Sequence, residues 1–142
     1  GAQHAAPHAE AIVGRLEDED DAVRVAAVAA MEGTPGAFAA PHALAIVGLL
    51  QHADAGVRMS ALKVLGALGA QHAAPHAEAI VGRLEDEDDA VRVAAVAAME
   101  GTPGAFAAPH ALAIVGLLQH ADAGVRMSAL KVLGALGAQH AA

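Results

Sequence analysis

The sequence contains no cysteine, tryptophan or tyrosine, and its only aromatic residues are Phe38 and Phe106. The absence of cysteine excludes disulfide bonds, thiol catalysis and metal sites with thiolate ligands. Without cysteine, the sequence gives no indication of the redox compartment. Lysine and arginine together number only eight against sixteen acidic residues, giving a net charge of −8. Because nucleic-acid binding needs a basic face, this balance argues against a nucleic-acid partner.

Long hydrophobic runs are also lacking. No apolar stretch approaches the roughly 18 residues of a membrane span. The first residues, GAQHAAPH, contain neither the basic region nor the apolar segment of a signal peptide. We therefore expect a soluble protein with no membrane partner, cytoplasmic when expressed, and the sequence names no natural compartment.

What the chain does contain is an internal repeat. Residues 1–68 are identical to residues 69–136, and residues 137–142 begin a third copy. Within the 68 residues lies a diverged half-repeat of 34, since AAPHAEAIVGRL at Ala5 returns as AAPHALAIVGLL at Ala39. The inner duplication has drifted and the outer one has not. The outer copy is therefore interpreted as engineered or as a very recent duplication.

Each half-repeat reads as a helical hairpin, because alanine-rich segments with apolar residues three and four apart favour helices. We predict a single all-α domain over residues 1–142, an α-solenoid of four hairpins at about 5–38, 39–72, 73–106 and 107–142. Each first helix is expected to start at a proline such as Pro7 or Pro41. The second helix of hairpin two is expected to be one turn longer than that of hairpin one.

Polar residues mark the start of each second helix. Asp20 and Asp54 are predicted N-caps, because aspartate at this position accepts a hydrogen bond from the first helical turn. Arg24 and Arg58 follow four residues later, so we expect local Asp20–Arg24 and Asp54–Arg58 ion pairs. Gly69 is expected to end the second helix of hairpin two.

The pattern resembles the HEAT-repeat family, in particular its short HEAT-like members. The residues that carry the resemblance are Leu16, Asp18, Asp20, Val23, Arg24, Ala27 and Met31, with Leu50, Asp54, Val57, Arg58, Ala61, Leu65 and Leu68 in the second half. The resemblance covers practically the whole chain and implies a binding scaffold. His52 and His120 stand where Asp18 and Asp86 stand in the other half, which interrupts any Asp–Arg ladder between neighbouring hairpins.

Histidine, acidic and hydroxyl side chains are the candidates for chemistry. His8, His42, His76 and His110 occupy equivalent positions, but neighbours about 10 Å apart cannot share one metal ion. The acidic turn Glu17–Asp21 lacks the spacing of a calcium loop. Ser60 and Thr34 have no histidine at a spacing typical of a nucleophile and its base. We therefore expect no enzyme activity, no metal and no cofactor.

The ends of the array suggest a function. Repeat arrays need terminal units with a polar outer face, yet here the first hairpin equals the third and the second equals the fourth. The predicted self-association residues are Ile12, Val13, Leu16, Val132, Leu133 and Leu136. A second copy can cover both surfaces head to tail, and we expect a closed ring in preference to a filament. Residues 137–142 are expected to bridge the contact as residues 69–74 do inside the chain.

The alternative is a protein-binding scaffold. The family resemblance places the second helices on the concave side, where Arg24, Glu32, Arg58, Met59 and Lys63 can meet a protein ligand. A face dominated by alanine with few aromatic residues makes a poor binding hot spot, so this interpretation ranks second.

Overall fold

The computed structural model describes residues 8–33, 42–101 and 108–141, and every regular element within these ranges is helical. The first hairpin consists of α2 (Ala9–Gly14), the 3-10 turn η2 (Arg15–Glu17) and α3 (Asp21–Gly33). The second comprises α4 (Ala43–Gly48), η4 (Leu49–Gln51) and α5 (Ala55–Ala67), and the third α7 (Ala77–Gly82), η6 (Arg83–Glu85) and α8 (Asp89–Gly101). The fourth comprises α9 (Ala108–Gly116), η8 (Leu117–Gln119) and α10 (Ala123–Ala141), while α6 (Ala70–Ala73) and η5 (Ala74–His76) join the second hairpin to the third.

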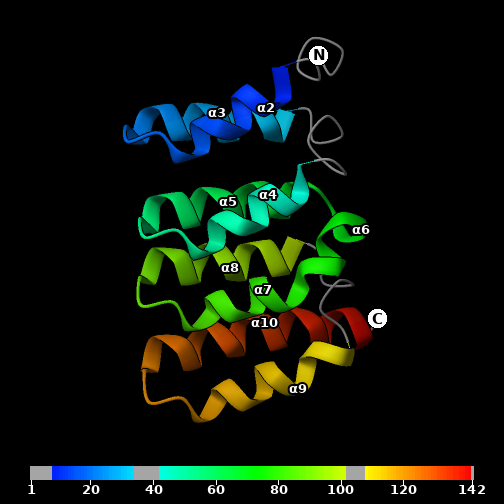
Figure 1. The fold of residues 1–142 in the computed structure, drawn as a ribbon. Coiled ribbons are helices and arrows are strands. Elements are labelled where there is room, and N and C mark those ends of the chain that lie inside the picture. Colours follow the sequence, from blue (N-terminus) through cyan, green and yellow to red (C-terminus); the bar gives the residue numbers. More distant parts are fainter. Residues whose placement is uncertain (1–7, 34–41, 102–107, 142) are drawn as a thin grey trace.

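The four hairpins stack side by side in two layers (Figure 1). Helices α3, α5, α8 and α10 form one layer, and the shorter α2, α4, α7 and α9 form the other. The first and fourth hairpins lie at opposite ends of the stack, so each has one flank with no neighbouring hairpin. This arrangement confirms the predicted all-α solenoid. The predicted hairpin boundaries near residues 39 and 107 fall outside the described residues.

Aspartate side chains start the second helices as predicted. The amide of Ala22 donates to Asp20 Oδ1 at 2.9 Å, and the amide of Gly56 donates to Asp54 Oδ1 at 2.7 Å. Each bond satisfies an amide that the first helical turn leaves without a backbone partner. Pro7 and Pro41, the predicted starts of first helices, lie outside the described residues.

The predicted difference in helix length is wrong. Helices α3 and α5 both contain 13 residues. Gly69 ends α5, as predicted, because it turns the chain with a φ of 92°, a conformation that glycine adopts without strain. Its copy Gly137 lies inside α10, which continues to Ala141. The terminal residues therefore extend a helix, whereas residues 69–74 inside the chain turn into the next hairpin.

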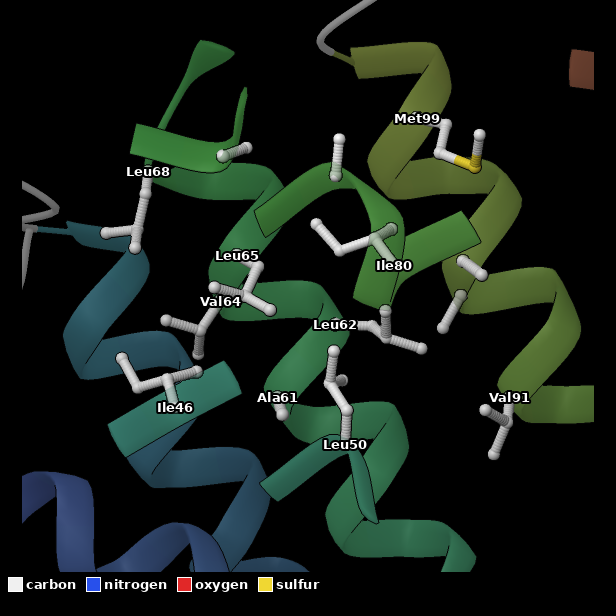
Figure 2. Close-up of a cluster of buried hydrophobic side chains, with 14 of the residues drawn as sticks. Ile46, Leu50, Ala61, Leu62, Val64, Leu65, Leu68, Ile80, Val91 and Met99 are labelled. Atoms are coloured by element: carbon white, nitrogen blue, oxygen red, sulfur yellow. The ribbon is translucent and has the colours of Figure 1, made fainter. Parts of the chain in front are cut away.

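The core runs along the stack between the two layers. Figure 2 shows its centre, where Leu62 and Leu65 of α5 lie among side chains from the neighbouring helices. The residues predicted to face inward from α5 are all buried, namely Val57, Ala61, Val64 and Leu65, together with Leu68 just after it. Burial of these side chains supplies the main driving force for stacking one hairpin on the next.

Candidate functional site

The contact between α5 and α8, called here the central junction, joins the two identical halves of the chain. Arg58 on α5 and Asp86 just before α8 form a two-pronged ion pair across it. Arg58 Nε lies 2.9 Å from Asp86 Oδ2, and Nη2 lies 3.0 Å from Oδ1. Both residues are buried. Parallel double bonding of this kind fixes the relative orientation of the two groups as well as their distance.

Further hydrogen bonds hold the Asp86 carboxylate in place. The amide of Asp88 donates to Oδ1 at 2.9 Å, and Arg83 Nη1 donates to Oδ2 at 3.0 Å. Burial alone would raise the pKa of Asp86, but the hydrogen bonds from Arg58 and Asp88 and the charges of Arg58 and Arg83 hold it below its ordinary value. The carboxylate therefore stays ionised in the folded protein.

A close approach of two helices forms the second feature of the central junction. A Cβ atom added to Gly66 on α5 would lie only 3.1 Å from the Cα of Ala98 on α8 and 3.3 Å from its Cβ. A side chain at position 66 would therefore push the two helices apart. Glycine opposite alanine lets their backbones come together.

The other two junctions lack the ion pair. Asp86 lies 28 residues after its partner Arg58. The residue 28 positions after Arg24 is His52, so a histidine occupies the equivalent place at that junction. The buried Nε atom of Arg24 has no hydrogen-bond partner there, and the same holds for Arg92, whose equivalent residue is His120. The substitution of histidine thus breaks the Asp–Arg ladder at these junctions, as the sequence indicates.

The predicted local ion pairs are wrong. Arg24 Nη1 donates to the backbone carbonyl of Asp18 at 2.7 Å, and Nη2 lies 3.2 Å from Asp21 Oδ1. Arg58 reaches across the junction to Asp86 instead of turning back to Asp54. The carboxylates of Asp20 and Asp54 cap helix amides, so they point over the helix start and away from the arginine four residues later.

Residues that are buried at the central junction have copies that are exposed at the two ends of the stack. Leu62 at the central junction is 0% exposed, whereas its copy Leu130 on α10 is 60% exposed. Val91 at the same junction is 0% exposed, whereas its copy Val23 on α3 is 37% exposed. Since each pair shares one sequence context, the neighbouring hairpin accounts for the difference.

These residues define two surfaces. The C-terminal flank consists of Arg126, Leu130 and Gly134, all of them exposed and all of them copies of residues on the α5 side of the central junction. The N-terminal flank consists of Asp18, Val23, Ala26 and Ala30, which are copies of Asp86, Val91, Ala94 and Ala98. Of these four, Asp18 is half-buried and the other three are exposed.

The polar groups of both flanks are already held as they are at the central junction. Arg126 Nη1 donates to the carbonyl of His120 at 2.7 Å, the same distance as the bond from Arg58 to His52. The Asp18 carboxylate accepts hydrogen bonds from the amide of Asp20 at 2.8 Å and from Arg15 at 2.9 Å. The Asp86 carboxylate accepts the equivalent bonds from Asp88 and Arg83. Among the described residues, no carboxylate pairs with Arg126.

The six residues predicted from sequence occupy mixed positions. Leu16, Val132 and Leu136 are buried within the chain, so they leave little surface for a second molecule. Ile12, Val13 and Leu133 are partly buried and pack against the core. The structure adds five exposed candidates that the sequence alone did not indicate, namely Arg126, Leu130, Gly134, Asp18 and Val23. The signal that finds them is the exact repeat, once the structure shows which copies the central junction covers.

The metal, membrane and concave-face candidates have less structural support. In the described part of the chain, no three histidine, aspartate or glutamate side chains gather to hold a metal ion. No described helix combines the length and the apolar character needed to cross a bilayer. Of the residues predicted for a concave binding face, Arg24 and Arg58 are buried in junctions, while Glu32 and Lys63 are exposed and Met59 is partly buried. Because Arg24 and Arg58 are buried, only three of the five side chains predicted for this face are accessible to a protein ligand.

Two hollows beside the junction helices lack the form of a small-molecule pocket. The groove between α3 and α5 measures about 150 Å³, below the roughly 300 Å³ at which small-molecule pockets begin. A larger hollow of about 670 Å³ lies over the central ion pair, but no large apolar side chain lines it. Its lining residues are Gln51, His52, Ala53, Arg58, Gly82, Arg83, Glu85, Asp86 and Glu87.

Comparison with known proteins agrees with the stacked geometry. A family model described as HEAT repeats matches residues 9–100, which is more than half of the chain. The chain belongs to the HEAT-repeat family. No curated protein matches it in sequence. One solved structure with a similar shape is that of an engineered protein from the Northeast Structural Genomics Consortium, with a TM-score of 0.56 and 20% identity. The alignment covers 90% of this HEAT-repeat chain and 62% of that one, and at this identity it supports the fold alone.

Proposed function

We propose that this chain is an engineered HEAT-repeat scaffold whose two flanks associate head to tail into a homo-oligomer. The perfect identity of residues 1–68 and 69–136 supports an engineered origin, since natural repeats drift apart. A solved structure with a similar shape is also that of an engineered protein. Non-enzymatic scaffolding is the role that fits a stack of hairpins without a catalytic cluster among its described residues.

The observation that carries this proposal is the exposure of Leu130 and Val23, set against the complete burial of their copies Leu62 and Val91. At the central junction, the copies of these two surfaces already pack against each other within the chain. A second copy can supply the missing neighbour with side chains of identical sequence. Burial of apolar surface is the main driving force of such association.

The contact joins two different surfaces, so it is heterologous. Such contacts produce a ring when the rotation closes and an open filament when it does not. The first and fourth hairpins lie at opposite ends of the stack, which favours contact between chains over closure within one chain (Figure 1). Most soluble homo-oligomers have closed symmetry, so we propose a ring.

The test measures mass in solution by light scattering at several protein concentrations. The proposal predicts a discrete multimer of the 14.0 kDa chain. Leu130→Glu should reduce the mass to that of a monomer, because it places a charge in the C-terminal flank. Leu112→Glu is the matched control, since Leu112 is 82% exposed and its copy Leu44 stays 72% exposed beside a neighbouring hairpin.

The outcomes separate the alternatives. A mass that grows steadily with concentration would replace the ring by a filament. A monomer at every concentration would refute self-association and leave the protein-binding scaffold. Equal masses for the Leu130→Glu and Leu112→Glu variants would show that another surface mediates the contact.

A further inference from the structure

We infer that a second copy docks in one register only, with Arg126 bonded to Asp18 of the partner subunit and Gly134 packed against the partner subunit's Ala30. This inference rests on the proposed head-to-tail association and adds the residues that fix its register. These pairs reproduce Arg58–Asp86 and Gly66–Ala98, the two closest features of the central junction.

The ion pair forms between groups that need little rearrangement. Arg126 makes the same two backbone hydrogen bonds as Arg58, at 2.7 Å and 3.0 Å against 2.7 Å and 3.1 Å. Asp18 keeps the local hydrogen bonds that orient Asp86. Groups held in their bound geometry lose little conformational freedom on association, so more of the interaction is retained as affinity.

The helix contact sets how closely the two chains can approach. At the central junction, the space at Gly66 is filled by the backbone of Ala98. At the C-terminal flank, no atom of the described residues outside the backbone of α10 itself lies within 4 Å of a Cβ added to Gly134. Gly134 is thus an open position that a neighbouring α3 can fill, with Ala30 in the place of Ala98.

Wrong dockings bring like charges together. Contact between two C-terminal flanks would face Arg126 with a second Arg126, and contact between two N-terminal flanks would face Asp18 with a second Asp18. A shifted register would bury Arg126 without an acceptor. Unpaired and like charges in an interface are strongly unfavourable, so they select against these arrangements.

A steric test uses glycine substitutions. Gly134→Leu should abolish the multimer while leaving helicity unchanged or higher, because leucine favours a helix more than glycine does. Gly116→Leu is the matched control. Its copy Gly48 has no atom within 4 Å of an added Cβ although a third hairpin packs beside its own, so a leucine at 116 should leave the mass unchanged.

A charge-swap test addresses the register. Arg126→Asp and Asp18→Arg should each weaken association about 30-fold or more, the effect of disrupting a buried charge pair. Asp18→Arg also removes the acceptor that Asp18 Oδ1 offers to the amide of Asp20, a role that His52 Nδ1 fills for Asp54, so the helicity of this variant is measured beside its mass. Mixing the two variants should restore the multimer with the chains alternating, because each contact then pairs an arginine with an aspartate.

The results distinguish this inference from the function on which it rests. If the unsubstituted chain assembles and the Gly134→Leu and Arg126→Asp variants assemble equally well, the inferred register is wrong and self-association stands. If the mixture stays monomeric while the separate variants remain helical by circular dichroism, the Arg126–Asp18 pairing is wrong. A monomeric unsubstituted chain would overturn both.

Discussion

Removal of the central carboxylate offers the sharpest test of how the stack is held together. In Asp86→Ala, the Arg58 side chain, 8% exposed, loses both of its carboxylate hydrogen bonds and remains a buried unpaired charge. Breaking a buried ion pair by removing one partner costs about 3–5 kcal/mol. The loss of the bond from the Asp88 amide adds about 1 kcal/mol.

The chain provides its own control for this change. Asp18→Ala removes the same residue from an identical local sequence, including the equivalent bond from the amide of Asp20 and the pair with Arg15. That pair is exposed on the arginine side and contributes at most about 1 kcal/mol. The difference between Asp86→Ala and Asp18→Ala therefore isolates Arg58, and we expect it to be about 3–5 kcal/mol.

The measurement is urea unfolding followed by circular dichroism. Asp86→Ala and Asp18→Ala are each made separately in the Gly134→Leu chain, so that association does not contribute. Because each hairpin contacts only its neighbours, weakening the central junction can also split the transition into two. A free energy of unfolding that differs by less than about 1 kcal/mol between the two variants, with one transition in each, would show that the ion pair does not hold the halves together.

Two further predictions concern the same network. Because the pKa of Asp86 is held below the ordinary aspartate value of about 3.9, its stabilising effect is complete above that pH and is lost as the pH falls through the lower folded-state pKa. The stability gap between Asp86→Ala and its parent should therefore narrow as the pH falls below the ordinary aspartate pKa of about 3.9, and a gap that does not narrow in urea unfolding would contradict this. His52→Asp should offer the buried Arg24 Nε an acceptor and raise the unfolding free energy by about 1–3 kcal/mol, and an unchanged or lower urea midpoint would count against it.

The sequence predicts much of the fold because its signals are local and repeated. Helical spacing identifies the hairpins, and the caps at Asp20 and Asp54 follow from residue type and position alone. The same reasoning fails for Arg24 and Arg58. The sequence shows an aspartate four residues before each arginine, but it does not show that capping already occupies that carboxylate.

The candidate interface was harder to predict for a related reason. Periodicity indicates that a side chain faces inward, but not whether its own hairpin or the next hairpin covers it. Leu16 and Leu136 are covered by their own chain, whereas Leu130 depends on a neighbour. Only the comparison of Leu130 with its copy Leu62 in three dimensions separates the two cases.

The phase of the repeat decides which kind of contact the ends can make. Junctions of the Arg–His kind, at Arg24 and Arg92, leave a buried Nε without an acceptor, whereas the central junction satisfies Arg58 fully. The flanks of this chain carry Arg126 and Asp18, so a contact between copies would be of the Arg–Asp kind. An array of the same hairpins shifted by one half-repeat would instead bring an arginine against a histidine. Such an array would bury a similar apolar surface but lack the Arg–Asp pair, so the proposed contact would owe its specificity to phase more than to buried area.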